Sequence, residues 1–179
     1  PLYMLNITPI SLKKGKPTKS TNSVILIEKN KANAKMGFSK WEIAELKKSA
    51  ENGGVAILRN EKECKVVVQI EKPTNQSSPK SKEECRRKGA ILFKETKKYQ
   101  IESLCLVSHL ADTSYLLALA EGIVLSNYQF LTYKSDKKKN TLKQISIDDS
   151  KIKPAELSEL NDVLMGTFIT RTLVNEPVI

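Results

Sequence analysis

Short runs of apolar, often β-branched residues alternate along this chain with longer segments whose apolar residues recur every three or four positions. The runs are typical of buried strands and the longer segments of amphipathic helices, so the pattern predicts an α/β fold. We expect strands at residues 23–28, 54–58, 65–70, 101–107 and 142–147, and helices at about 40–52, 82–96, 113–129 and 154–175.

The helix at 40–52 has clear signals at both ends. Ser39 can cap it, and Glu42 stands at the position that completes a capping box. Phe38 and Ile43 have the spacing of a hydrophobic staple, which fixes how the chain enters a helix. Gly53 begins a glycine doublet that can adopt the left-handed conformation and end the helix.

The connections also carry signals. Few residues separate the strands at 54–58 and 65–70, and a parallel return needs about a dozen or more, so we expect an antiparallel hairpin. Residues 73–79 have the composition of a loop. Ser81 and Glu84 then form a second expected capping box, and Pro154 suits the first turn of the last helix.

Length and composition indicate one ordinary globular domain. The chain has 179 residues, of which 40% are hydrophobic and 28% charged, and no apolar run reaches the roughly 18 residues of a membrane span. The first residues do not resemble a signal peptide, so we expect a cytoplasmic protein with no membrane partner. Cys64, Cys85 and Cys105 are odd in number and widely spaced, which favours reduced, buried thiols over disulfides or a zinc site.

The formal charge of +10 suggests nucleic acid as an alternative partner. Basic residues cluster at 13–16, 86–88, 97–98 and 137–139. The clusters alternate with acidic residues, however, and no aromatic residues interleave with them as a base-stacking surface would require. We therefore favour a solvated, lysine-rich surface over a nucleic-acid-binding module.

A search for catalytic motifs assigns no catalytic, cofactor-binding or metal-ligating residue. The sequence contains no glycine-rich nucleotide motif, nucleophile elbow or zinc-protease motif. The single histidine, His109, follows a strand and lacks an evident orienting partner, so a structural role is favoured. Glu83-Glu84 is expected at a helix start, where carboxylates complement the helix dipole, and Asp148-Asp149 in a turn.

Two stretches near the C-terminal end resemble the leucyl (cytosol) aminopeptidase family. The first reads Ala-Glu-Gly-Ile-Val-Leu-Ser-Asn-Tyr-Gln-Phe at residues 120–130 and is followed by Tyr133-Lys134. The second reads Thr-Arg-Thr-Leu-Val-Asn-Glu-Pro at residues 170–177. It is similar to the segment through which that family passes from its N-terminal into its catalytic domain. Residues 1–110 carry no such motif.

The resemblance implies a macro-domain-like layered mixed sheet with flanking helices over residues 1–150, and a connector helix over residues 151–179. It also implies a hexamer and a following domain that holds two divalent metals, zinc or manganese, and removes N-terminal residues from peptides. The family's metal ligands lie beyond residue 177, so none transfers to this chain. We therefore expect a non-catalytic assembly domain, with its catalytic domain as partner.

Physical roles follow for the residues of these stretches. Gly122 is costly within a helix unless another element approaches closely there. The rings at 128, 130 and 133 can be buried while a hydroxyl reaches a partner. Arg171 and Glu176 flank the helix end, where each can either hold the connector or be solvated at the surface.

The apolar residues of the last helix are expected to form two sets. One set contacts the N-terminal domain: Leu157, Leu160 and Leu164. The other contacts, at least partly, the catalytic domain: Phe168, Ile169, Leu173 and Val174. Without that partner the helix should fold back on its own domain or pair with a second chain.

A macro-like fold raises a third alternative, a stand-alone nucleotide-binding domain. Such a site requires a glycine-rich phosphate loop at the start of a helix. The doublet Gly53-Gly54 follows a helix and enters a strand, which is the opposite order. We therefore favour this alternative least.

Overall fold

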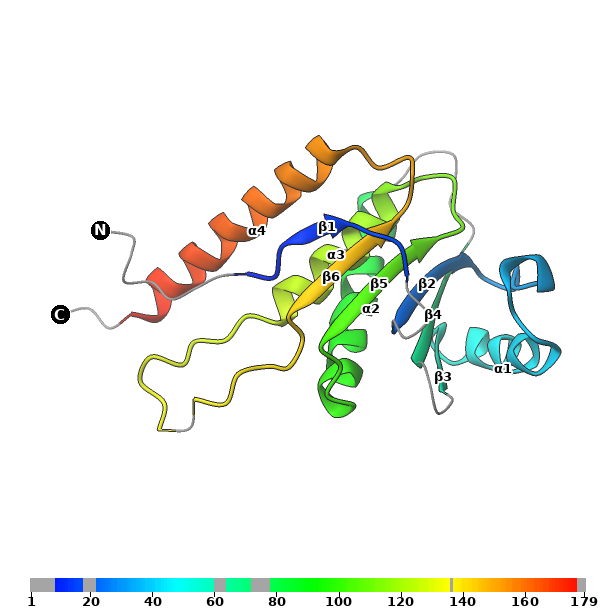
Figure 1. The fold of residues 1–179 in the computed structure, drawn as a ribbon, viewed down its shortest axis with the longest axis horizontal. Helices are drawn as coiled ribbons and strands as arrows, with labels where there is room; N and C mark the ends of the chain where they lie inside the picture. Colours follow the sequence, from blue (N-terminus) through cyan, green and yellow to red (C-terminus); the bar gives the residue numbers. More distant parts are fainter. Residues whose placement is uncertain (1–8, 18–21, 60–63, 72–77, 136, 177–179) are drawn as a thin grey trace.

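A computed structural model describes residues 9–17, 22–59, 64–71, 78–135 and 137–176. It confirms the layered α/β fold, with a six-stranded mixed sheet and four α-helices among these residues (Figure 1). The strands are β1 (Leu12–Lys14), β2 (Ser23–Glu28), β3 (Val55–Arg59), β4 (Cys64–Ile70), β5 (Ser103–Ser108) and β6 (Gln144–Asp148). The helices are α1 (Lys40–Glu51), α2 (Pro79–Lys98), α3 (Ser114–Ser126) and α4 (Pro154–Asn175), with a 3₁₀ turn at Ala34–Met36 that the sequence did not reveal.

The sheet has the order β1-β6-β5-β2-β4-β3, and only β3 at one edge runs antiparallel to its neighbour. The antiparallel hairpin of β3 and β4 is confirmed. Its register places Ile57 opposite Val66, and Val66 in turn pairs with Val24 of the central strand β2. The β-branched runs therefore occupy the middle of the sheet, as their composition predicts.

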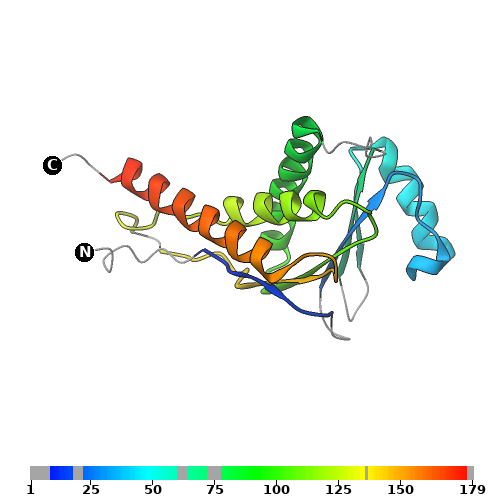
Figure 2. The same ribbon diagram turned by 90° about the horizontal axis from the view of Figure 1, so that it is seen from above.

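The helices cover the two faces of the sheet unequally. Helices α2, α3 and α4 pack on one face over the main core, whereas α1 lies on the other face beside β2, β3 and β4 (Figure 2). The smaller core under α1 is formed by five buried residues: Ile27, Phe38, Leu46, Leu58 and Val67. None of the helices in the described part of the chain has the length and apolarity to span a bilayer.

The expected start of α1 is confirmed. The Glu42 amide donates to Ser39 Oγ at 3.2 Å, and the Ser39 amide donates to a Glu42 carboxylate oxygen at 2.7 Å. Burial acts to raise the pKa of Glu42, but the hydrogen bonds with Ser39 and the Lys65 ammonium 3.6 Å away outweigh it and lower the pKa. Gly53, with φ of 84°, follows the helix end in the left-handed region.

The expected start of α2 was wrong by three residues. Ser78, not Ser81, caps the helix, because Pro79 occupies its first position, where the missing N–H costs nothing. The Ser81 amide donates to Ser78 Oγ at 3.2 Å. Residues 73–77 of the expected loop lie outside the described residues, and Pro79 belongs to the helix.

Strand β1 was not expected, because its lysines suggested a solvated surface. Asn161 of α4 fixes this edge strand: its side-chain oxygen accepts from the Leu12 amide at 2.9 Å, and its nitrogen donates to the Leu12 carbonyl at 3.1 Å. The amide therefore satisfies backbone groups that an exposed sheet edge would leave free. After β1 the chain passes so close to β6 that a Cβ on Gly15 would stand 3.0 Å from Ser146 Cβ.

Helices α2 and α3 cross at two glycines. A Cβ on Gly122 would stand 2.1 Å from the carbonyl oxygen of Arg86, and a Cβ on Gly89 would stand 2.4 Å from that of Leu119. Real side chains do not approach backbone so closely, so each helix needs a glycine at the crossing. The expectation that Gly122 permits a close approach is confirmed.

Candidate functional site: the joint between α3 and α4

The two stretches that resemble the aminopeptidase family meet in the structure, although about forty residues separate them in the sequence. We call their meeting point the α3–α4 joint; it comprises Leu125, Tyr128, Phe168, Arg171, Thr172 and Asn175. The Arg171 guanidinium donates from Nη1 to the carbonyl oxygen of Leu125 at 2.8 Å. It also lies 5.7 Å from the centre of the Tyr128 ring, within reach of a cation–π interaction.

Tyr128 is the centre of the joint. Its ring packs edge-on against the buried Phe168, with 5.2 Å between ring centres. Its hydroxyl lies 3.0 Å from Thr172 Oγ1, and Asn175 Nδ2 donates to it at 3.3 Å. The expected combination of a packed ring and a bonded hydroxyl is confirmed here. These contacts of Tyr128 attach the C-terminal part of α4 to the end of α3.

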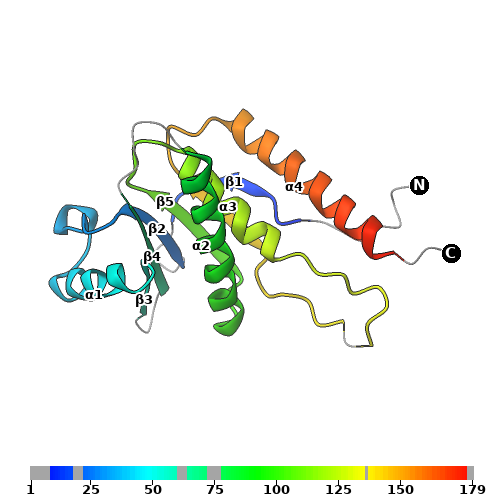
Figure 3. The same ribbon diagram turned by 180° about the vertical axis from the view of Figure 1, so that it is seen from behind.

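The loop between α3 and β6 adds a further contact at the end of α4. The Tyr133 hydroxyl donates to a Glu176 carboxylate oxygen at 2.5 Å, which raises the pKa of Tyr133. Figure 3 shows this loop extending below the C-terminal half of α4. Arg171 and Glu176 therefore both hold the helix, which is the first of the two roles that the sequence left open. Tyr133 as a whole, by contrast, is 63% exposed, so the expectation that its ring is buried was wrong.

The expected division of apolar residues along α4 was wrong at Phe168. Leu157, Leu164 and Phe168 are all buried in the main core of this chain, so Phe168 needs no further domain to cover it. The buried face of α4 continues at Thr172 and not at Val174. Thr172 is 2% exposed, whereas Val174 is 79% exposed. Helix α4 therefore docks along its whole length and keeps a separate outward face.

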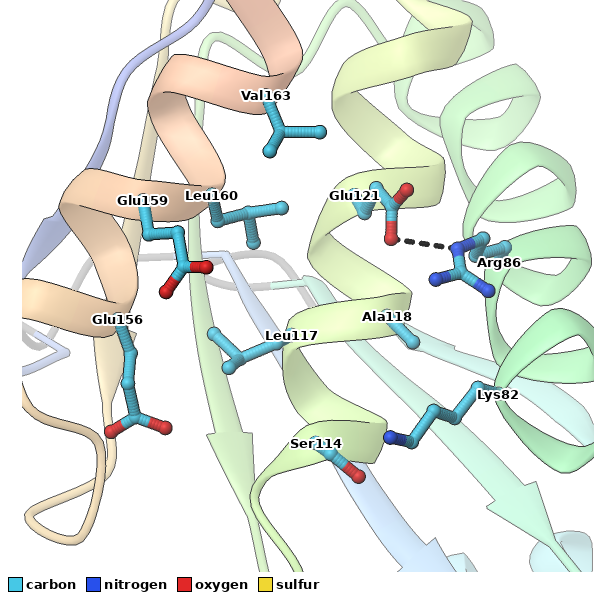
Figure 4. A pocket seen from close by; sticks show the side chains of 10 residues that line it. All are labelled: Lys82, Arg86, Ser114, Leu117, Ala118, Glu121, Glu156, Glu159, Leu160 and Val163. Carbon is cyan, nitrogen blue, oxygen red and sulfur yellow. Dashed lines mark hydrogen bonds and ion pairs between the residues drawn. The ribbon is translucent and has the colours of Figure 1, made fainter. Parts of the chain in front are cut away.

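A groove of about 290 Å³ lies between α4, α3 and α2 (Figure 4). Glu156 and Glu159 of α4 stand on one side, and Lys82 and Arg86 of α2 on the other; Leu117, Ala118, Leu160 and Val163 supply apolar surface. Arg86 is held by Glu121 at 2.6 Å. The groove contains no nucleophile bonded to a base: Ser114 Oγ is buried without a hydrogen-bond partner.

The polar residues considered from sequence lie apart from the groove and the joint. His109 is exposed just after β5, and its amide donates to the carbonyl of Leu26 at 2.9 Å. Asp149 accepts from the Lys151 amide at 2.9 Å, which is the expected turn chemistry. No three His, Cys, Asp or Glu side chains come together within the described ranges in a way that could hold a metal.

Glu83 and Glu84 do not act at a helix start as expected, because α2 begins earlier. Glu83 pairs with Arg87 at 3.2 Å, and Glu84 pairs with Lys88 at 2.9 Å. One of the basic clusters is therefore largely neutralised by its own helix. The lysines at 97–98 and 137–139 are exposed.

The three cysteines are free and buried, as expected. Burial raises the pKa of each thiol, and that of Cys85 to about 11. We predict that an aromatic disulfide reagent at pH 8 labels no thiol of the folded chain and all three after denaturation. Rapid labelling of a folded thiol would contradict this.

The same shift predicts a loss of stability in alkali. Because the folded pKa of Cys85 is raised from its ordinary 9.0 to about 11, the unfolded chain releases this proton first. The free energy of unfolding should therefore fall as the pH rises above 9, and Cys85→Ala should remove that part of the fall, as followed by denaturant titrations.

Comparisons with known proteins bear on the fold alone. No protein-family model matches the sequence, and no curated protein matches it in a sequence search. Among 78 matching chains of solved structures is a point mutant of tomato leucine aminopeptidase, with a TM-score of 0.68 and 17% identity. The two chains share a fold. The match covers 97% of this chain and 39% of the tomato enzyme, so this chain spans well under half of that enzyme's length.

Proposed function

We propose that this chain is the non-catalytic N-terminal assembly domain of a leucyl aminopeptidase-like metallopeptidase. The observation that carries the proposal is the α3–α4 joint: the two stretches that resemble the family contact each other through Arg171, Tyr128 and Asn175. A shared fold alone is compatible with many functions. The contact between the two family-like stretches supports the proposal more specifically than the shared fold does, because it involves the residues that carry the resemblance.

The joint gives a physical role to such a domain. Helix α4 is fixed in its first half by the contacts of Asn161 with β1 and near its end by Arg171 and Tyr128. A helix held at two separate points is a rigid arm, so whatever follows residue 175 in the parent is set at a defined angle to the sheet. Cytoplasmic location and a hexameric parent are parts of the same proposal.

Catalysis in the parent would need two divalent metals, zinc or manganese, which polarise the peptide carbonyl and activate water. The described residues do not fit such a centre, since they bring no three metal-binding side chains together. We therefore assign metal binding and catalysis to the following domain, the partner that the proposal requires.

The proposal predicts that the 179-residue chain is inactive by itself. Purified chain supplied with manganese or zinc should release no leucine from a leucyl amide, while a complete leucyl aminopeptidase assayed in parallel does. Metal-dependent release that copurifies with the folded chain, and is lost on its denaturation, would contradict a non-catalytic role.

The nucleic-acid-binding module remains the alternative from a different class. The exposed lysines of the loop after α3 favour it, whereas the pairing of Glu83 and Glu84 with their own helix does not. Diffuse phosphate binding should disappear near physiological salt. Sub-micromolar, sequence-selective binding at that salt would support the module instead.

A further inference from the structure

The outward face of α4 is largely apolar and uncovered in the described part of the chain. We define the α4 seam as the residues at helical spacing along this face: Glu159, Val163, Gly166, Thr170 and Leu173. Val163 is 55% exposed and Leu173 is 60% exposed. From Val163 to the helix end the only charged residue is Arg171, and it is engaged by the joint. Solvated helices rarely present so long an uncharged face.

Two features suit this seam to close contact with another helix. A Cβ on Gly166 would meet no atom within 4 Å, so nothing inside the chain requires a glycine there, although glycine costs about 1 kcal/mol in a helix. The hydroxyl of Thr170 donates to the carbonyl of its own Gly166 at 2.9 Å. The Thr170 hydroxyl is therefore satisfied within the helix, and its methyl group lies beside the backbone of Gly166, which carries no side chain. Another helix can approach such a surface closely.

We propose that the α4 seam pairs with the α4 seam of a second copy of this chain, antiparallel about a twofold axis at Gly166. This pairing concerns copies of this chain alone and does not depend on the proposed function. About this axis the two copies of Gly166 face each other, Val163 of each helix lies opposite Thr170 of the other, and Glu159 lies opposite Leu173. The axis also places the beginning of each helix beside the end of the other.

Charge favours a second copy as the occupant. Glu159 and Asp162, on the first half of α4, are exposed and form no ion pair with the described residues. The contact of Tyr133 with Glu176 places the exposed Lys134 at the other end of the helix. Gly166 lies about ten residues, or roughly 15 Å, from that end. An antiparallel pair therefore brings the acidic half of each helix toward Lys134 of its partner, and the contact occurs twice.

Cysteine cross-linking tests the axis directly, because the three natural cysteines are buried. In the pair, Gly166→Cys places two thiols at the crossing, where a disulfide can form. We expect mild oxidation to convert this variant to a covalent dimer at least tenfold faster than Ile91→Cys, a matched control on the exposed face of α2. Equal rates for the two variants would overturn the proposal.

Sedimentation of the full chain tests the energetics. Gly166→Gln should raise the dimer dissociation constant at least tenfold, and Ile91→Gln should leave it unchanged. Lys134→Glu should also weaken the dimer, and adding Glu159→Lys should restore at least part of the loss. A wild-type chain that stays monomeric up to millimolar concentration would overturn the pairing and leave the proposed function untouched. Metal-dependent leucine release by the isolated chain would overturn the proposed non-catalytic function and leave the pairing untouched.

Discussion

Replacing Gly122 by alanine should lower the free energy of unfolding by about 3 kcal/mol, near the upper end of the usual cost of overpacking. The added methyl group would stand 2.1 Å from the carbonyl oxygen of Arg86, which belongs to the backbone of α2 and cannot rotate away. The two helices must separate, and buried side chains between them, including Cys85 and Leu119, lose contacts. Denaturant unfolding followed by circular dichroism measures the loss.

Gly166→Ala is the matched control. It makes the same change within a helix, but its methyl group meets no atom within 4 Å. Helix propensity then decides the outcome, and alanine should stabilise the chain by about 0.5–1 kcal/mol. The unfolding experiment is done at concentrations too low for the chain to associate, because Gly166 lies at the proposed contact between two copies. Equal losses in the two variants would show that α2 and α3 do not cross at Gly122.

Phe168→Ala should lower the free energy of unfolding by about 3–5 kcal/mol, the usual cost of truncating a buried phenylalanine. Phe168 is 3% exposed and supports the ring of Tyr128 at the centre of the joint. Its loss should also release the end of α4, so hydrogen exchange should accelerate from about residue 168 onward before it does in the sheet.

Leu173→Ala is the control for this change, because the side chain lies further along the same helix α4 and is 60% exposed. It should alter the free energy of unfolding by no more than about 0.5 kcal/mol. If both substitutions cost the same, Phe168 is not part of the core, and the original expectation that it awaits another domain would be restored.

Local signals explain which parts of the fold could be predicted from the sequence. The capping box at Ser39 and the runs at 23–28 and 65–70 are decided by neighbours in the chain, and each matches the structure within a residue or two. The start of α2 was misplaced because two serines three residues apart could each act as cap. The proline between them decides for Ser78.

Long-range contacts explain what could not be predicted. Strand β1 has only three residues, two of them lysines, and it exists because β6 and Asn161 of α4 supply its hydrogen bonds. Phe168 was assigned to another domain because helical spacing alone does not show which apolar residues meet Tyr128. The joint itself joins residues about forty apart, and only the resemblance of both stretches to one family indicated that they belong together.

The most direct test of the central proposal is to isolate the natural protein that contains this chain, with an antibody against the 179 residues, and to determine its length and its peptidase activity. We expect a longer polypeptide in which a second, carboxylate-rich domain follows the helix, and which releases leucine from a leucyl amide when manganese or zinc is added. A natural protein without such a domain, or one whose second domain has no metal-dependent peptidase activity, would contradict the proposal.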